Sequence, residues 1–321
     1  MSELDYTYAV ARVRALETTL LSAADIDRLI ACQNERQCLQ LLSEKGWGET
    51  GQEPDAILAR ETEKTWEIIR ELSVDMGVFE VLDYPNRFHN LKAAIKEACT
   101  QETNANIFYK GSGIPPEELT RLVKDRAFDR LPSNMAAAAA EAYEVMLHTR
   151  DGQLCDLIVD KACLEAIYQK GQTAEDPIIR AYAETTVAVA DIKIAVRAQR
   201  TGKSIEFMQR AMAPCKSVNI DLLMKAALSG FEAVREYLSG TEYAEGAEAL
   251  GESASAFERW CDNRIIRLIQ PQKYNAFSAG PLFAYILARE NEIKTVRIVL
   301  TGKQNNLPEG FIRERVREMY V

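Results

Sequence analysis

Asn90-Leu-Lys-Ala-Ala-Ile-Lys96 is matched twice more in the sequence, by Asp191-Ile-Lys-Ile-Ala-Val-Arg197 and by Glu292-Ile-Lys-Thr-Val-Arg-Ile298. The aligned lysines of these segments, Lys92, Lys193 and Lys294, lie 101 residues apart. A fixed period of this size is the sequence signature of an internal repeat.

A second element lies upstream of each lysine segment. It reads Ile26-Asp-Arg-Leu-Ile30, Leu119-Thr-Arg-Leu-Val123 and Ile220-Asp-Leu-Leu-Met224. The distances from its first residue to the Leu or Ile before the lysine are 65, 73 and 73 residues. Because two elements keep their register in three copies, we predict three related units: 1–110, 111–212, and 213–321 with a C-terminal helix.

The fold class is predicted to be all-α. Ala, Leu, Glu, Arg and Lys dominate the sequence, and these residues favour helices. Trp66, Ile69, Leu72, Met76 and Phe79 recur at helical spacing, which predicts that they share one face. A further helix is expected after Pro132, capped by Ser133 or Asn134.

The arrangement of the units has two interpretations. Long helical repeats form open solenoids, whereas three units could instead curl into a compact pseudo-threefold body. The segment LPEGFIRERV (307–316) resembles IPPEELTRLV (114–123), so the C-terminus is predicted to open a fourth unit that is not completed.

The formal net charge of −9 and the pI near 5.1 disfavour a nucleic-acid-binding protein, which would carry a basic face. An acidic surface fits a partner with a basic patch, and it fits ordinary solubility equally well. The seven cysteines include no Cys-x-x-Cys pair and only two histidines are present, so we predict reduced thiols, no metal site and no cofactor.

No catalytic residue is predicted. Thr201-Gly-Lys-Ser204 contains part of a phosphate-binding loop, but the position that needs the first glycine is Arg197. His89 has Asn90 beside it and Asp83 nearby, without a nucleophile in a recognisable context, so a capping or packing role is favoured.

The N-terminal stretch lacks the layout of a signal peptide, and no apolar run approaches the roughly 20 residues that span a bilayer. We therefore expect any work at a membrane to depend on docking to another protein.

The repeated polar–Leu/Ile–Lys motif has two interpretations. In the structural one, the polar residue caps or faces solvent, the aliphatic residue packs inward and the lysine extends along the surface. In the functional one, the three helices present polar side chains to a central partner. The N-terminal helix around Arg12 and Arg14 is likewise a surface helix or a docking element.

Three segments of the chain resemble the C subunit of bacterial and archaeal V-type (A/V-type) ATPases, a family that includes the eukaryotic d subunit. They are YAVARVRALETTLL (8–21), RFHNLKAAIKEACT (87–100) and AYILARENEIKTVRIVLTGKQNNLPEGFIRERV (284–316). The resemblance runs essentially end to end. The middle unit, with Ala190-Asp-Ile-Lys193, departs furthest from the pattern.

The resemblance implies a funnel of three helical subdomains about a pseudo-threefold axis. It implies a non-catalytic socket that joins the D and F subunits of the central stalk to the membrane rotor ring, on the cytoplasmic face, and that carries torque for ATP-linked proton or sodium transport. The residues expected to bind partners are Arg12, Arg14, His89, Asn90, Lys92, Asp191, Lys193, Glu292, Lys294 and Arg297. The alternatives are a helical scaffold that binds a protein in a groove and an all-α enzyme.

Overall fold

The structure, a computed structural model, describes residues 6–49, 51–100 and 107–321. Within these residues the backbone forms helices, 3-10 turns and loops, and no strand. The all-α prediction is therefore confirmed. The chain divides into two units that are described separately: unit 1 is Met1–Met76, Asp176–Ile179 and Ala244–Val321, and unit 2 is Gly77–Glu175 and Arg180–Tyr243.

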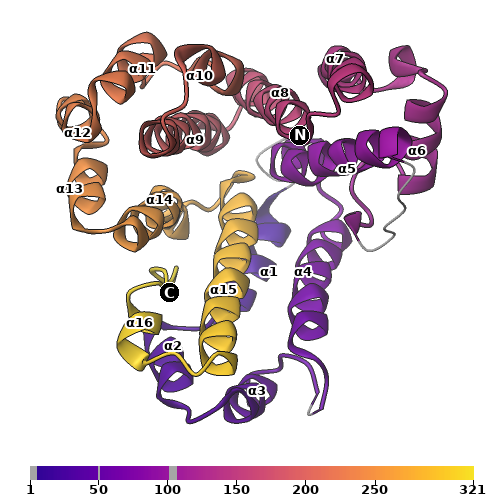
Figure 1. Cartoon of the computed structure of the whole chain (residues 1–321). Helices are drawn as coiled ribbons and strands as arrows, with labels where there is room; N and C mark the ends of the chain where they lie inside the picture. The colour runs from indigo at the N-terminus through magenta and orange to yellow at the C-terminus, as the bar shows by residue number, and fades with distance from the viewer. Residues whose placement is uncertain (1–5, 50, 101–106) are drawn as a thin grey trace. The chain divides into compact units, whose positions relative to one another are not determined.

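Unit 1 combines the N-terminal helices with the C-terminal ones (Figure 1). Its elements are α1 (Thr7–Glu17), α2 (Ala23–Ala31), α3 (Glu35–Glu44), α4 (Pro54–Glu71), α13 (Ala244–Glu252), α14 (Ala254–Ile269), η5 (Gln270–Tyr274), α15 (Gly280–Gln304) and α16 (Glu309–Arg313).

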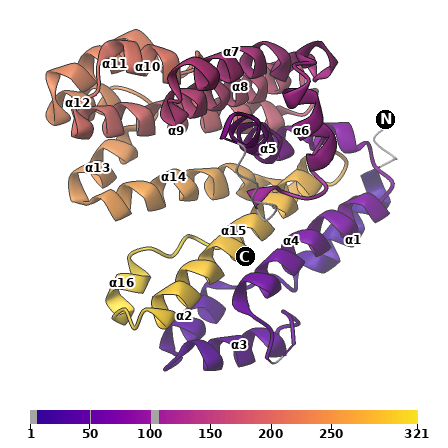
Figure 2. The ribbon, with the colours of Figure 1, turned by 45° about the vertical axis from the view of Figure 1, so that its right-hand side comes forward.

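Unit 2 is built from the middle of the chain, and Figure 2 shows α7 beside α8 in it. Its elements are α5 (Glu80–Thr100), α6 (Pro116–Lys124), η4 (Phe128–Arg130), α7 (Ser133–Thr149), α8 (Gly152–Thr173), most of α9 (Pro177–Thr201), α10 (Ile205–Ala211), α11 (Ile220–Ser229) and α12 (Phe231–Ser239). The short η2 (Met76–Val78) begins at the last residue of the first segment of unit 1.

The core of unit 1 joins the two ends of the chain. Leu29, Leu42 and Leu58 from the N-terminal helices pack in one cluster with Val296 and Val299 of α15. The first nine residues of α15, Gly280 to Ala288, are all buried, so this half of the helix is enclosed on every side. Burial of this extent makes α15 the central helix of unit 1.

Side-chain caps fix where several helices begin. Ser22 and Asp25 form a reciprocal capping box at the start of α2, and Asn219 accepts a hydrogen bond from the backbone of Leu222 at the start of α11. The helix predicted after Pro132 does begin at Ser133. The predicted cap is wrong, because Pro132 takes the N-cap position and no side chain caps the helix there.

The apolar face predicted from Trp66 to Phe79 is interrupted. The helix α4 ends at Glu71, and Ser73 adopts a left-handed φ of 54°. Leu72 and Phe79 are still buried, because the turn redirects the chain and not because one helix continues. The expectation of a single helical face is therefore wrong beyond Leu72.

Within the segment 307–316 the structure has one short helix, α16, which is five residues long. Ile312 of this helix is buried in the unit 1 core, and Arg313 forms an ion pair with Asp27 of α2. The C-terminal segment therefore packs on the first repeat.

Candidate functional site

The polar residues of the three repeated motifs, Asn90, Asp191 and Glu292, are buried, with exposed fractions of 1%, 0% and 1%. Each accepts a hydrogen bond from a backbone N–H. The donor residue in each case lies in the loop just before one copy of the upstream element, which begins at Leu119, Ile220 or Ile26. We call these contacts the first joint (Asn90–Tyr109), the second joint (Asp191–Ala213) and the third joint (Glu292–Leu21).

The first joint is a two-way pairing between a side-chain amide and the backbone N–H and carbonyl of one residue. The N–H of Tyr109 donates to Oδ1 of Asn90 over 2.8 Å, and Nδ2 of Asn90 donates to the carbonyl of Tyr109 over 2.9 Å. His89 lies beside it, with Nε2 at 2.9 Å from the carbonyl of Ile107 and its ring edge-on to Tyr109. His89 is half-buried and has a packing role here.

The second joint has one hydrogen bond. The N–H of Ala213 donates to Oδ1 of Asp191 over 3.1 Å, and Oδ2 has no partner among the residues that the structure describes. Burial raises the pKa of Asp191 to about 8. Desolvation favours the neutral acid, since no close ion pair opposes it within the described part of the chain.

The third joint belongs to a buried ionic cluster. Glu292 accepts from the N–H of Leu21 and pairs with Arg289, which also donates to Oε2 of Glu61 over 2.6 Å. Burial raises the pKa of Glu292, and the Arg289 charge opposes that shift. The guanidinium of Arg289 also lies 4.9 Å from the ring centre of Trp47.

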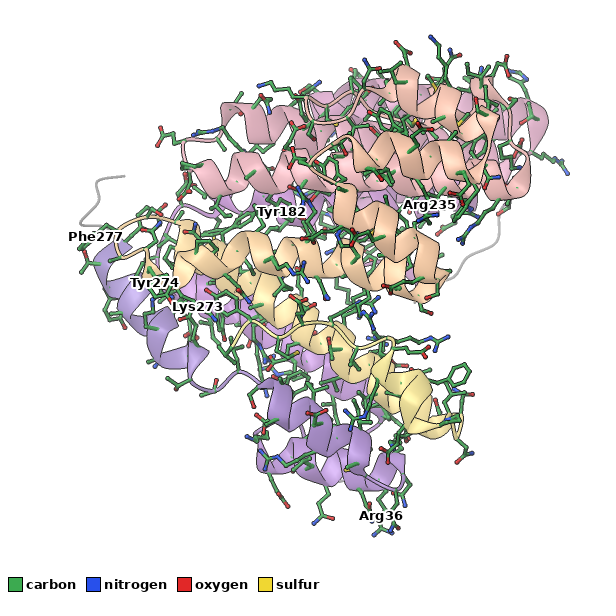
Figure 3. The ribbon with its side chains drawn as sticks, turned by 90° about the vertical axis from the view of Figure 1, so that its left-hand side faces the viewer. Arg36, Tyr182, Arg235, Lys273, Tyr274 and Phe277 are labelled. Atoms are coloured by element: carbon green, nitrogen blue, oxygen red, sulfur yellow. The ribbon has the colours of Figure 1, made fainter. Side chains whose placement is uncertain are left out.

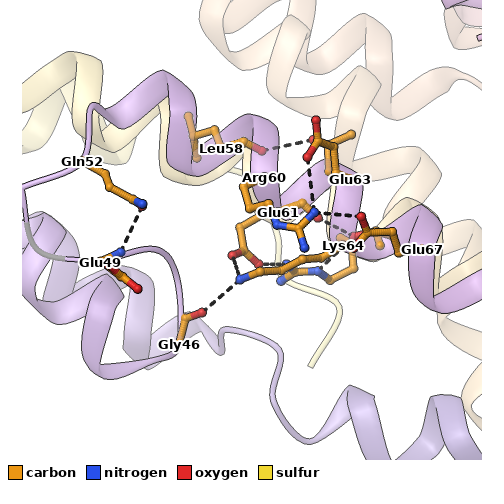
Figure 4. A network of polar contacts seen from close by, with 12 residues as sticks. Gly46, Glu49, Gln52, Leu58, Arg60, Glu61, Glu63, Lys64 and Glu67 are labelled. Carbon is orange, nitrogen blue, oxygen red and sulfur yellow. Dashed lines mark hydrogen bonds and ion pairs between the residues drawn. The ribbon is translucent and has the colours of Figure 1, made fainter. Parts of the chain in front are cut away.

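Figure 4 shows how α4 carries one end of this cluster. Glu61 pairs with Lys64, which reaches the carbonyl of Gly46, and the neighbouring Arg60 pairs with Glu63 and Glu67 on the exposed side. The exposed pairs contribute little to stability, whereas the buried carboxylate depends on its partners.

The expectation that Asn90, Asp191 and Glu292 cap helices or face solvent is wrong. The helices that carry them bring them into the interior, where they bond the backbone of the chain's own loops. Binding of a partner by these three side chains stays a prediction.

Two of the three aligned lysines form ion pairs with aspartates on other helices of the same unit. Lys92 contacts Asp160 of α8 over 2.7 Å, and Lys294 contacts Asp262 of α14 over 2.6 Å. Burial raises the pKa of Asp262, but the charges of Lys294 and Arg317 outweigh it and hold that pKa below its ordinary value. Lys193 is half-buried and also has a partner within the chain.

The predicted basic residues of unit 1 differ in their surroundings. Arg12 is exposed on α1, whereas Arg14 pairs with Glu17 and donates to the carbonyls of Gln272 and Asn275. Arg297 forms an exposed pair with Asp55. Of the ten predicted residues, five lie in unit 1 and five in unit 2.

The segment between α14 and α15 carries an exposed aromatic pair that was not predicted from the sequence. Tyr274 is 91% exposed and Phe277 is 57% exposed, and both are labelled in Figure 3. Arg14 donates a hydrogen bond to the carbonyl of Asn275, which lies between the two aromatic residues. The side-chain amide of Asn275 donates to the side chains of Gln272 and Ser278. A segment held by such hydrogen bonds, with exposed aromatic side chains, has the composition of an interface anchor.

Three further features bear on the chemistry. Thr201-Gly-Lys-Ser204 is a turn between helices, in which α9 ends at Thr201 and Ser204 caps α10 by accepting from the N–H of Phe207. In the described ranges, no group of acidic, Cys and His side chains is arranged to hold a metal ion. The same ranges contain no helix that is both long and apolar enough to cross a bilayer.

The fold and the joints define an all-helical protein. In each of its three repeated motifs, the buried polar residue accepts a hydrogen bond from a backbone N–H. The chain belongs to the ATP synthase (C/AC39) subunit family, whose sequence model matches residues 9–315.

Individual relatives are distant but match over most of their length. The C subunit of the V-type sodium ATPase of Enterococcus hirae is 21% identical, over 83% of this chain and 82% of its own. The C subunit of the A-type ATP synthase of Methanocaldococcus jannaschii is 24% identical, over 96% and 85% of the two chains. That of a Desulfurococcus species is 20% identical, over 98% and 90%. An ATP synthase subunit is part of a membrane-associated complex, which agrees with the resemblance noted from the sequence.

Proposed function

We propose that this chain is the non-catalytic central-rotor subunit of a V-type ATPase. In this role it is a socket that joins the D and F subunits of the central stalk to the rotor ring and transmits torque for ATP-linked proton or sodium transport. It works on the cytoplasmic face of the membrane through protein contacts and has no enzymatic activity of its own. Family membership and the names of the relatives support this role.

The observation that carries the proposal is the third joint. Leu21 precedes the first copy of the upstream repeat element and Glu292 lies in the last copy of the lysine motif, so their hydrogen bond joins the last repeat to the first. The shared core of unit 1 supports the same connection. An open solenoid would bring each repeat into contact with its sequence neighbours alone. The contact supports the proposed subdomains 1–110, 111–212 and 213–321 to the extent that the first and the last of them meet in unit 1.

Torque transmission needs a body that does not deform when a force acts between two partners. Helices packed at crystal-like density have low compressibility. The joints add hydrogen bonds that are shielded from water, and such bonds are costly to break, since a buried donor or acceptor left alone is penalised.

Partner contacts are expected on side chains that the chain itself leaves accessible. Arg12, Tyr274 and Phe277 meet this condition in unit 1, and Arg with exposed aromatic residues is the composition found at interface hot spots. The buried polar residues of the joints have the supporting role of holding the repeats together.

A binding experiment tests the role. Purified chain is mixed with a tagged D–F complex and, separately, with rotor ring in detergent, and ATP hydrolysis by the chain alone is measured. We expect capture by both partners and no hydrolysis above buffer. ATP hydrolysis by the purified chain itself, or failure of both partners to capture the chain, would contradict the proposal.

A further inference from the structure

Asp191 differs from its two counterparts in what surrounds its side chain. Asn90 is neutral, and Glu292 has Arg289 beside it, but Asp191 is fully buried with a single hydrogen bond, from the N–H of Ala213. Its second oxygen, Oδ2, is buried and has no partner in the described residues. An ionised carboxylate in this position would be both desolvated and half unsatisfied.

The first joint shows which hydrogen-bonding pattern this position needs. Asn90 offers one acceptor to the backbone N–H of Tyr109 and one donor to the backbone carbonyl of the same residue. A carboxylate is an acceptor only, whereas a protonated carboxylic acid has one O–H donor and retains acceptor capacity. The neutral acid is therefore the form of Asp191 that reproduces the pattern of the Asn90 amide.

The charged groups around Asp191 do not offset its burial. The ammonium of Lys161 on α8 favours the carboxylate, but this group donates to the carbonyl of Gln209 over 2.9 Å. The thiol of Cys215, in the turn after α10, is the neighbouring titratable group on that side, and burial raises its pKa as well. On α10 itself, the charged side chains Glu206 and Arg210 are exposed.

We propose that Asp191 is held in the folded chain as a neutral carboxylic acid that takes the place of the Asn90 amide, so that the second joint is released by alkaline pH. The Oδ2–H group would donate to the carbonyl of Ala213, the residue whose N–H binds Oδ1, as Nδ2 of Asn90 donates to the carbonyl of Tyr109. Loss of this proton leaves a buried anion and loosens the turn that leads into α11. The inference concerns the chain's own second joint and does not depend on the proposed rotor function.

The direction in which stability changes with pH follows from the raised pKa of Asp191. An aspartate titrates near 3.8 in an unfolded chain, and burial raises the pKa of Asp191 to about 8 in the folded one. The stability contributed by the neutral acid is fully present below pH 4, declines as pH rises, and is lost once pH passes 8. Between these limits the unfolding constant rises about tenfold for each pH unit.

Reciprocal substitutions test the proposal. Asp191→Asn removes the titrating group and keeps the hydrogen-bonding pattern, and Asn90→Asp introduces the same acid at the first joint. Urea unfolding of the full chain is measured from pH 6 to pH 9. We expect the ratio of the wild-type unfolding constant to that of D191N to rise about 50-fold between pH 6 and pH 8, and to level off near 100-fold by pH 9. N90D should acquire an additional dependence of the same sign.

A ratio that stays constant across this range would overturn the proposal. If either variant fails to fold, ¹³C-labelled aspartate carboxyls in the wild-type chain give a second readout. One carboxyl should then titrate near pH 8. A spectrum in which every aspartate carboxyl titrates below pH 6 would equally contradict the neutral-acid assignment.

Discussion

The backbone N–H of Leu21 donates a hydrogen bond to the buried carboxylate of Glu292, 271 residues further along the chain. This contact ties the start of the first repeat to the central helix α15, and Arg289 and Glu61 complete the cluster around it. The integrity of unit 1 should therefore depend on a few buried polar side chains.

Glu292→Ala should destabilise the chain by about 3 kcal/mol, because it leaves the Leu21 N–H without an acceptor and Arg289 with one carboxylate. Glu292→Gln keeps an acceptor for Leu21 and should cost less. The measurement is the free energy of unfolding in urea at pH 7. Equal stabilities of E292A and the wild type would show that the third joint contributes nothing.

Arg289→Met should cost roughly 3–5 kcal/mol, because it leaves the carboxylates of Glu61 and Glu292 buried without their shared cation. The loss should grow with pH, since burial raises the pKa of Glu292 and the charge of Arg289 would no longer oppose that shift. Adding Glu61→Gln and Glu292→Gln should recover a large part of the loss. Failure of the triple variant to recover would mean that the packing of Arg289 on Trp47 matters more than its charge.

Gly302→Ala should destabilise the contact between α15 and α16. A Cβ at this position would lie 2.7 Å from Cγ1 of Ile312, a buried core residue, so the short helix must move. Overpacking of this kind costs about 1–3 kcal/mol. Gly310→Ala is the matched control, because its Cβ would meet nothing within 4 Å. Thermal unfolding should separate the two, with G302A melting lower than the wild type and G310A not.

Charge exchange separates a structural role of the lysines from a binding role. Lys294→Asp should weaken capture of the D–F complex in either case, because it breaks the pair with Asp262. Because Arg317 also pairs with Asp262, the variant Lys294→Asp/Asp262→Lys/Arg317→Met is used to restore an ion pair with its charges reversed and without a second cation beside it. Recovery of capture would assign Lys294 to the fold of unit 1, whereas continued loss would assign its charge to the partner.

Tyr274→Ser with Phe277→Ser should change stability by less than about 0.5 kcal/mol, because both side chains are exposed. Capture by the rotor ring or the D–F complex should fall at least tenfold if these residues are anchors. Leu228→Ser, an exposed apolar position on α11, is a control on unit 2. Unchanged capture of both partners would remove the aromatic pair from the interface.

The helical class and the repeated motif could be predicted from the sequence because both are local, periodic signals. The burial of Asn90, Asp191 and Glu292 could not, because a polar residue beside a lysine is ordinarily exposed. Their partners lie in loops 19 to 271 residues away, and no local pattern specifies such a pairing.

The buried role of Arg289 could not be predicted from the sequence either. It stands three residues before Glu292, a spacing that suggests an ordinary surface pair on one helix. The need for a buried cation arises from Glu61 on α4, which the chain brings to α15 through tertiary packing. The exposure of Tyr274 and Phe277 could not be predicted for a similar reason, since their segment is held by Arg14, which lies far away in the sequence.

The most direct test of the central claim is sequential capture on immobilised rotor ring. We predict that the ring retains the D–F complex when this chain is present and releases it when the chain is omitted. Retention of D–F by the ring without the chain, or failure of the chain to bridge them, would contradict the socket role.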